Sequence, residues 1–302
     1  MIPTWYIDYK NIIEKSLNSY LELYFSDEKN KWLTEIKDSA IYAVKWWKRI
    51  RSILALEFYL IISWKTIKDI NKDSDIIKFC ISLELLHAYS LVHDDLPAMD
   101  NDEYRRWELT TWKKYWYANA ILVWDLLNSL AFEVLAETWN IALIKMFWKA
   151  VWLKWMLWWQ VLDLYYENNF DNLSLDNLIE THNKKTGALI EVSVLGGILL
   201  WNLTLNKDSK FKKEDVLKYS DFWKKIWLAF QVKDDLLDEE WTFEETWKSV
   251  WDGEKKWFVF FVWLEKTKEY LENLITDCFV VSDSLNSEKL NFIINYIKQR
   301  TK

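Results

Sequence analysis

Five carboxylates lie within ten residues, and two arginines, Arg105 and Arg106, follow them directly; the acidic residues are Asp94, Asp95, Asp100, Asp102 and Glu103. Like charges at this density repel one another unless something positive lies between them. Carboxylate oxygens are the ligands that Mg²⁺ prefers, and this ion usually takes further ligands from substrate phosphates. The stretch therefore predicts a divalent-metal site, with the two arginines placed for the anionic group that the metals bring in.

A second acidic cluster, formed by Asp234, Asp235 and Asp238, follows an apolar helical run far downstream. Asp234 and Asp238 are four residues apart and share a helix face, and Gln231 lies one turn before Asp234. A plain acidic helix end is the simpler explanation, but two leucines separate the aspartates where such an end would be polar. The two clusters predict two walls of one metal–phosphate site.

Three basic residues, Lys48, Arg49 and Arg51, stand directly ahead of an apolar run. Lys48 and Arg51 are one helical turn apart on the same face, which suits an anion. A solvated basic helix start explains the same pattern.

His87 lies two helical turns before Asp94 and shares its face. A ligand role and a satisfied core histidine both fit that position.

Pro97 lies inside the first acidic stretch, lacks a backbone N–H and interrupts regular helix. We therefore expect a bulge or kink that turns Asp100 back toward Asp94.

Farther along, a Lys-Thr-Gly sequence at 185–187 stands in a helical context, where Gly costs about 1 kcal/mol. A local kink that exposes a backbone carbonyl would explain that glycine.

Apolar residues recur at three-to-four-residue spacing along most of the chain. The pattern predicts helix over 1–45, 53–64, 75–96, 120–136, 146–166 and 216–238, and a lysine-rich helical segment from 248 to the end. No segment shows strand alternation between turn dipeptides, and no linker-like tract interrupts the chain. We predict an all-α protein whose residues 1–302 form one domain, a bundle of about ten or more helices with both acidic clusters facing a central cavity.

The composition limits the class of protein. A formal net charge of -7 argues against a nucleic-acid-binding protein, which would show a basic face. Cys80 and Cys278 lie far apart in apolar helical contexts, so we expect buried free thiols in a reducing cytoplasm. The N-terminus lacks the pattern of a signal peptide. Charges interrupt every long apolar run, so no membrane span is expected.

Tryptophan and glycine have unusual counts, with 23 tryptophans and only 4 glycines. Glycine normally makes up about 7% of a chain, so the two residue types together would be an ordinary glycine number for this length. Tryptophan pairs stand at 46–47 and 158–159, and many others stand where a chain turns or helices approach closely. We hypothesise that most of these residues are glycines in the living protein, encoded by UGA codons that its host reads as glycine. A protein truly rich in tryptophan is the alternative.

These motifs together resemble those of the short-chain trans-polyprenyl diphosphate synthases, most of all the bacterial farnesyl diphosphate synthases, over nearly the whole chain. The family's Gly-Gly-Lys-Arg-x-Arg-Pro corresponds to 46–52, and its first Asp-rich motif with the following Arg-Arg-Gly-x-Pro-Thr corresponds to 94–100 and 105–110. Further matches are Gly-Gly-Gln-x-x-Asp at 158–163, Lys-Thr-Gly at 185–187, Phe-Gln-x-x-Asp-Asp-x-x-Asp at 230–238 and Gly-Lys-x-x-Gly at 247–251. Tryptophan repeatedly stands where the family has glycine.

The chain departs from the family pattern at a few positions. Ser52 and Leu109 stand where proline is preferred, and Trp112 stands where histidine or asparagine is common. Trp257 and Phe258 replace the usual Thr-Tyr, which leaves the loop after the second Asp-rich motif open. None of these positions belongs to the expected metal or diphosphate ligands.

The resemblance implies the isoprenoid synthase fold and three Mg²⁺ ions, with Mn²⁺ as a possible substitute. It implies that Asp94 and Asp100 hold metal on one wall and Asp234 on the other, with support from Asp95, Asp235 and Asp238. The metals would bind the diphosphate of an allylic substrate, with help from Arg105, Lys185, Lys248 and Lys255. Isopentenyl diphosphate would occupy a basic pocket formed by Lys48, Arg51, His87 and Arg106. The allylic cation would be shielded by Lys185, Thr186 and Gln231, and the released diphosphate would accept the final proton.

Product length is expected to depend on Tyr89 and its neighbour Ser90. Tyr89 lies five residues before Asp94, about 7.5 Å along a helix axis, where its ring would floor the pocket for the growing chain. In the family, an aromatic residue here together with the longer Asp94–Asp100 spacing resembles farnesyl diphosphate synthases, which make a C15 product. A C20 geranylgeranyl product is the alternative.

Other classes of protein fit less well. A terpene cyclase shares the helical fold but generally lacks the basic pocket and the Lys-Thr-Gly sequence, and a non-catalytic homologue would be expected to lose one acidic motif. The resemblance also implies a cytoplasmic homodimer that acts on isopentenyl and allylic diphosphates, without nucleic acid as a partner.

Overall fold

The computed structural model describes residues 2–26, 30–45, 48–105, 107–151, 161–162, 165, 169, 174–177, 187–204, 213–240 and 261–300. The chain divides into two compact units. The first contains Met1–Leu60, Trp64–Ile144 and Thr246–Lys248, and the second contains Ile61–Ser63, Lys145–Glu245 and Ser249–Lys302. The single domain expected over residues 1–302 stays a prediction.

Helices and one small hairpin make up the first unit. Its elements are α1 (Thr4–Tyr24), α2 (Lys31–Ala43), α3 (Ile50–Ser63), a 3₁₀ turn η1 (Ile67–Asp69), α4 (Asp75–Asp94), β1 (Tyr104–Arg105), β2 (Glu108–Leu109), α5 (Thr111–Tyr115) and α6 (Tyr117–Ala136). The next helix, α7 (Ile141–Val151), has residues in both units. The second unit also contains α10 (Gly187–Thr204), α11 (Lys213–Glu240), α14 (Leu264–Ser284) and α15 (Glu288–Lys298). Nearly every described residue in a regular element is helical, so the predicted all-α class is confirmed.

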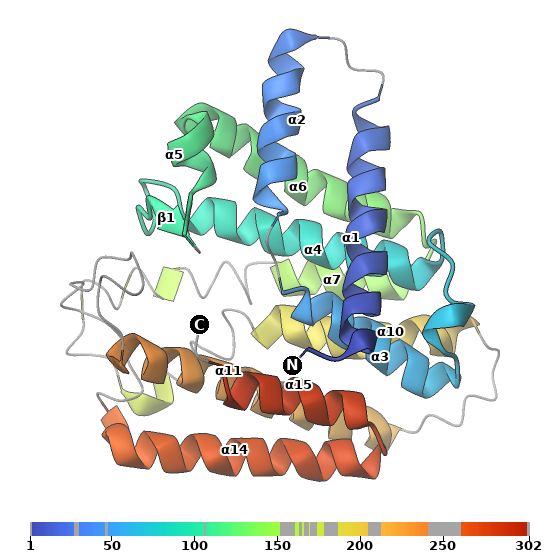
Figure 1. The fold of residues 1–302 in the computed structure, drawn as a ribbon, viewed down its shortest axis with the longest axis vertical. Helices are drawn as coiled ribbons and strands as arrows, with labels where there is room; N and C mark the ends of the chain where they lie inside the picture. The colour runs from blue at the N-terminus through green and yellow to red at the C-terminus, as the bar shows by residue number, and fades with distance from the viewer. Residues whose placement is uncertain are drawn as a thin grey trace. The chain divides into compact units, whose positions relative to one another are not determined.

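Helix α4 forms the centre of the first unit. It packs along α6 (Figure 1) and also contacts α1 and α2. Its residues Ile76 to Ala88 are almost all buried, including Phe79, Leu83 and Leu86. A helix that is apolar on every face belongs in a core, and α4 therefore holds the start of the first acidic stretch on a rigid support.

Helices α4 and α6 are both long and apolar enough, by length and composition alone, to cross a membrane. Charges nevertheless interrupt both helices, as expected, with Glu84 in α4 and Asp125 and Glu133 in α6. The two helices pack against each other, and 72% of the apolar window in α4 is buried. A core helix of this kind meets the same test as a membrane span.

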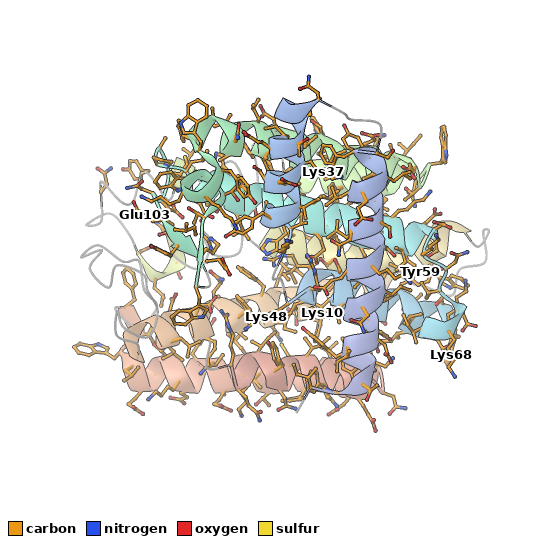
Figure 2. The ribbon with its side chains drawn as sticks, turned by 45° about the horizontal axis from the view of Figure 1, so that its top comes forward. Lys10, Lys37, Lys48, Tyr59, Lys68 and Glu103 are labelled. Atoms are coloured by element: carbon orange, nitrogen blue, oxygen red, sulfur yellow. The ribbon has the colours of Figure 1, made fainter. Side chains whose placement is uncertain are left out.

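Hydrogen bonds from α1 hold the start and the middle of α3. The hydroxyl of Tyr9 donates to the Glu57 carboxylate at 2.8 Å, and both side chains are buried. The hydroxyl of Tyr6 donates to the carbonyl oxygen of Lys48 at 2.6 Å, directly ahead of α3. Figure 2 shows Lys48 at this position. The basic run is thus held by the N-terminal helix.

Helix α11 occupies the centre of the second unit. It packs against α10 and α14, and α14 also packs against α15 (Figure 1). A Cβ at Gly187, the first residue of α10, would lie 3.0 Å from the ring of Trp223 and 3.1 Å from the ring of Trp227. The close contact with α11 therefore favours glycine here, and the kink expected around this glycine lies outside the described residues.

Both cysteines are buried and free, which confirms the prediction of unpaired thiols. Cys80 lies on α4 and Cys278 on α14. Burial raises the pKa of Cys278 to about 12 and the pKa of Cys80 well above its usual value. Neither thiol is therefore ionised near neutral pH.

The hairpin of β1 and β2 was not predicted. Its strands are antiparallel, with Tyr104 opposite Leu109 and Arg105 opposite Glu108. Strands of two residues are too short to show the period-two pattern from which a strand is recognised. The expected helix over 146–166 agrees with α7 up to Val151 and with the helical residues 161, 162 and 165, and its other residues lie outside the described part.

Candidate functional site

The first acidic stretch forms a bulged turn at the end of α4. The backbone N–H of Asp95 still donates to the carbonyl of Leu91 at 3.0 Å, and the backbone N–H of Asp100 donates to the carbonyl of Asp94 at 2.9 Å. Leu96 is buried beneath the turn, whereas Pro97 is exposed. The chain therefore returns from Pro97 so that Asp100 lies beside Asp94 along the backbone, as predicted.

Asp95 points inward from this turn and binds Arg105. Its carboxylate accepts from Nε of Arg105 at 2.6 Å, and a second guanidinium nitrogen lies 3.5 Å from Asp102. Burial raises the pKa of Asp95 to about 6, although the Arg105 charge opposes this shift. The contacts to Asp95 and Asp102 raise the pKa of Arg105, although its burial acts in the opposite direction. In this structure Arg105 fixes the turn.

Asp94 and Asp100 differ in exposure. Asp100 is exposed, whereas the Asp94 side chain is only 17% exposed and its carboxylate lies 3.2 Å from Nδ1 of His93. Among the described residues, no three His, Cys, Asp or Glu side chains converge into a closed metal cage. Two carboxylates on one turn do fit Mg²⁺, because this ion keeps several waters and needs only one or two protein carboxylates beside a phosphate.

Arg49 is paired with carboxylates and a backbone carbonyl of the protein itself. Its guanidinium donates to Glu84 at 2.9 Å and to the carbonyl of Val44 at 2.7 Å, and it lies 3.4 Å from Glu14. Both Arg49 and Glu84 are buried. A buried cation with this set of partners is neutralised, so Arg49 orders the loop ahead of α3.

Arg51 faces His87 rather than a carboxylate. Its Nη1 lies 3.1 Å from Nε2 of His87, and its Nε is buried without a hydrogen-bond partner among the described residues. Burial lowers the pKa of Arg51 to about 10, against the opposing charge of Glu84, so the guanidinium stays charged at neutral pH. A desolvated cation beside a histidine is suited to bind an anion.

Ser52 gives a local reason for one departure from the family pattern. Its hydroxyl donates to Glu84 at 2.6 Å and lies 3.0 Å from the carbonyl of Cys80. Serine therefore ties the first turn of α3 to α4, which a proline side chain could not do.

Glu84 holds both Arg49 and Ser52, and sequence reasoning missed this role. Its signal in the sequence was a carboxylate among the mostly apolar residues 79–86.

The expected chain-length residues lie on α4. The ring of Tyr89 is half-buried and stacks on the ring of Trp124, with 5.9 Å between centroids. Burial raises the pKa of Tyr89. The Ser90 hydroxyl donates to the carbonyl of His87 at 2.9 Å. Their control of product length stays a prediction.

The second acidic cluster lies on α11. Asp234 accepts a hydrogen bond from the guanidinium of Arg300, Asp235 is buried and Gln231 is half-buried. Asp238 belongs to the same helix, but its side chain is outside the description. Sequence reasoning missed Arg300, because nothing in a C-terminal tail indicates which helix it meets.

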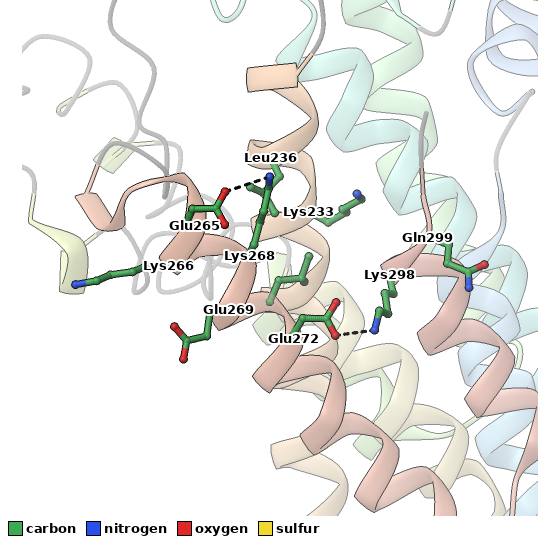
Figure 3. Close-up of a pocket in the computed structure, with 10 residues that line it drawn as sticks. Lys233, Leu236, Glu265, Lys266, Lys268, Glu269, Glu272, Lys298 and Gln299 are labelled. Carbon is green, nitrogen blue, oxygen red and sulfur yellow. Dashed lines mark hydrogen bonds and ion pairs between the residues drawn. The ribbon is translucent and has the colours of Figure 1, made fainter.

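A separate charged groove of about 670 Å³ lies in the second unit (Figure 3). Lys233 and Leu236 of α11 line it, together with residues of α14 and the end of α15. Lys298 pairs with Glu272 at 2.6 Å and Lys268 pairs with Glu265 at 3.6 Å. The charges of the lysines and glutamates that line this groove largely cancel.

Several expected site residues lie outside the described part of the chain. These are Arg106, Lys185, Thr186, Lys248 and Lys255, and the tryptophan pair at 46–47. Their expected contacts with substrate stay predictions.

Comparison with known proteins gives the class. The sequence model of the polyprenyl synthetase family matches residues 32–297, and the chain belongs to this family of prenyltransferases. A farnesyl diphosphate synthase of Micrococcus luteus is 33% identical over 84% of this chain and 85% of its own length. A geranylgeranyl pyrophosphate synthase of Arabidopsis thaliana is 31% identical over 84% of this chain and 67% of its own.

A solved structure agrees with this class. A geranyltransferase from Helicobacter pylori, complexed with magnesium and isoprenyl diphosphate, is 28% identical to this chain. The two superpose with a TM-score of 0.74 over 99% of this chain and 97% of the other. The predicted family and fold are therefore confirmed.

Proposed function

We propose that this chain is a farnesyl diphosphate synthase, which condenses isopentenyl diphosphate with dimethylallyl or geranyl diphosphate. Family membership and the relatives support this proposal. The observation that carries it lies in one unit: Arg51 has a buried Nε without a hydrogen-bond partner among the described residues and lies beside His87. The helix that carries His87 ends in the turn of Asp94 and the exposed Asp100.

Arg51 and His87 are the proposed ligands of the isopentenyl diphosphate, together with Lys48 and Arg106. Nη1 of Arg51 donates to Nε2 of His87, which brings together side chains from two helices. Arg49 is excluded from this role because Glu84 already neutralises it. A diphosphate bound here would restore to Arg51 the hydrogen bonds that burial has taken from it.

Asp94, Asp100 and Asp234 are the proposed ligands for three Mg²⁺ ions, for which Mn²⁺ could substitute, with support from Asp95, Asp235 and Asp238. Bound Mg²⁺ would supply positive charge to the diphosphate that leaves the allylic substrate. Arg105 keeps Asp95 oriented at 2.6 Å and, with Lys185, Lys248 and Lys255, is proposed to meet the same diphosphate. The assignment of both acidic clusters to one diphosphate rests on the sequence motifs.

The proposed reaction breaks the allylic C–O bond and forms a C–C bond to the double bond of isopentenyl diphosphate. Carbonyl and amide oxygens of Lys185, Thr186 and Gln231 would shield the allylic cation electrostatically. The proton lost from the condensed chain passes to the released diphosphate, so no protein base is needed.

A C15 product is proposed because the Tyr89 ring stands on α4 ahead of the acidic turn. The ring is held by stacking on Trp124, which limits its movement. Geranylgeranyl diphosphate, with a C20 chain, is the alternative product, and the Arabidopsis relative carries that name.

A homodimer and a cytoplasmic location are also proposed. Helix α6 supports the dimer, because only 39% of its apolar window is buried and Leu122 is exposed. The two buried free thiols agree with a reducing compartment.

One assay tests the activity. The purified protein would be incubated with radiolabelled isopentenyl diphosphate, Mg²⁺ and each allylic primer in turn, and the products sized by chromatography. A labelled C15 product from both dimethylallyl and geranyl primers is expected. A cyclic hydrocarbon would identify a terpene cyclase, and absence of incorporation with every primer would refute the proposal.

A further inference from the structure

Positive φ angles in this protein fall mostly on tryptophan. Eight described residues other than glycine have a positive φ, and five of them are Trp64, Trp107, Trp116, Trp139 and Trp263. Two of the other three are asparagines, the residue type that tolerates this region best after glycine. A bulky aromatic residue with positive φ is an outlier, so five in one chain require an explanation.

Three of these tryptophans occupy positions that normally select glycine. Trp64 ends α3 in the left-handed conformation, with φ 57° and ψ 25°, and helices commonly end on glycine in this conformation. Trp139 follows α6 with φ 53°. Trp107 has φ 71° in the two-residue turn between β1 and β2, and such turns favour glycine or asparagine.

The backbone at Trp116 and Trp263 is more restrictive still. Trp116 has φ 81° and ψ 151° directly before α6, and Trp263 has φ 67° and ψ 149° directly before α14. This combination of a positive φ with an extended ψ is populated essentially by glycine alone. Any side chain with a Cβ is strained at both positions.

The five indoles gain little burial to offset this strain. All are exposed, and Trp64, Trp139 and Trp263 are 94%, 90% and 78% exposed. A tryptophan retained for packing would be buried, as apolar burial is what stabilises such a side chain. Backbone conformation and exposure therefore point to the same residue type.

We infer that positions 64, 107, 116, 139 and 263 are glycines in the protein that the cell makes. The same replacement accounts for most of the 23 tryptophans, and a UGA codon read as glycine by the host is its cause. Trp112 differs, because it lies in α5 and its indole N–H donates to the carbonyl of Asp102 at 2.8 Å.

Peptide mass spectrometry of the protein isolated from its host is the decisive experiment. Peptides that span the five positions should be lighter than the printed sequence requires by the mass difference between tryptophan and glycine. Peptides without tryptophan serve as the mass control. Tryptophan masses at these positions would overturn the inference.

Thermal unfolding of the recombinant printed sequence gives an independent test. Trp116→Gly should raise Tm, and it should raise Tm more than Trp116→Ala, because alanine keeps the Cβ that strains this backbone. Trp112→Gly is the matched control and should lower Tm, since it removes a hydrogen bond. An unchanged or lower Tm for Trp116→Gly, or an equal gain for alanine, would contradict the inference.

A second and independent observation concerns the tail after α15. The guanidinium of Arg300 donates to Asp234 on α11 and lies 4.6 Å from the ring centre of Phe230, one turn earlier. The Arg300 side chain is mostly buried, whereas a third of the Asp234 side chain is exposed. The tail therefore places a cation on the first aspartate of the second acidic cluster.

We propose that Arg300 is a positioning residue that neutralises Asp234 until a divalent cation and a diphosphate arrive, an inference that rests on the proposed function. A positive charge beside a carboxylate weakens its attraction for a second cation. Arg300 must therefore give up part of its contact when Asp234 binds metal. The ring of Phe230 offers the guanidinium a stacking surface that does not depend on Asp234.

Calorimetric titration with Mg²⁺ in the presence of inorganic diphosphate tests this role. Arg300→Gln should tighten the apparent Mg²⁺ affinity by about three- to tenfold. Lys298→Gln removes the same charge two residues earlier, from the pair with Glu272 (Figure 3), and should leave that affinity unchanged. Weaker binding in Arg300→Gln would mean that Arg300 binds diphosphate, and it would overturn the proposal, as would an equal effect of both variants.

The outcomes separate this role from the proposed function. If the unmodified protein incorporates isopentenyl diphosphate and Arg300→Gln leaves Mg²⁺ affinity unchanged, the role of Arg300 is refuted alone. If the unmodified protein shows no incorporation and binds no Mg²⁺ with diphosphate, the proposed function fails as well.

Discussion

Two arginines at the start of α3 have opposite environments although only Ile50 separates them. Arg49 is paired with the carboxylates of Glu84 and Glu14, whereas Arg51 makes no ion pair among the described residues and lies beside His87. The sequence predicts the basic run and the face that Arg51 shares with Lys48. It could not predict which charge is compensated, because Glu84 comes from a helix 35 residues farther along.

Replacing each arginine by glutamine should separate binding from stability. Arg51→Gln should raise KM for isopentenyl diphosphate by about ten- to a hundredfold, with little change in unfolding free energy, because a charged hydrogen bond to substrate is lost. Arg49→Gln should lower the unfolding free energy by about 3–5 kcal/mol, because it leaves Glu84 buried without its cation. Steady-state kinetics and urea unfolding of both variants measure these effects, and a similar profile for the two would contradict the division of roles.

Tyr89→Ala should lengthen the product from C15 toward C20 or beyond. The ring lies on α4 before the acidic turn, and its removal would open space along the helix. Chromatography of the labelled products measures the change, with Tyr104→Ala in the hairpin as a control of the same residue type. An unchanged product would show that another residue limits the chain.

At the scale of elements, α4 connects the basic run, the histidine and the acidic turn. Ser52 and Arg49 bind Glu84 on α4, and the bulge at Pro97 turns the chain back. Hydrophobic periodicity and the proline were enough to predict these helices and the turn. The β1–β2 hairpin could not be predicted, since it depends on a two-residue turn and on the contact of Arg105 with Asp95 rather than on a repeating pattern.

Tyr9→Phe tests how α1 supports α3. The change removes the hydroxyl that donates to the buried Glu57 carboxylate at 2.8 Å. Loss of a donor to a buried carboxylate should lower the unfolding free energy by about 1–3 kcal/mol. Tyr24→Phe, at the exposed end of α1, should have almost no effect in the same urea titration. Equal effects would mean that the Tyr9 hydroxyl contributes nothing specific.

At the scale of the whole molecule, one family model spans residues of both compact units. The motif set predicted this membership, because its acidic, basic and Lys-Thr-Gly parts occur in the family order. The motifs could not show how the two units are arranged or whether two chains associate, since surface complementarity leaves no short sequence pattern.

A homodimer that uses α6 should be sensitive to charge on that helix. Leu122→Lys places a charge on an exposed apolar position of α6, where burial against a second chain would be costly. Sedimentation equilibrium should give twice the 36.8 kDa chain mass for the unmodified protein and a lower mass for Leu122→Lys. A monomeric unmodified protein, or a variant with unchanged association, would contradict this interface.

The central claim is that both acidic clusters serve one prenyl transfer. Its most direct test is the turnover of Asp94→Ala and Asp234→Ala with geranyl diphosphate, labelled isopentenyl diphosphate and Mg²⁺. Each change should reduce turnover by about two to three orders of magnitude or more, because charge stabilisation of the leaving diphosphate is lost. Asp75→Ala on α4 and Asp221→Ala on α11 are controls on the same helices and should stay near normal. Near-normal turnover in either Asp94→Ala or Asp234→Ala would contradict the claim.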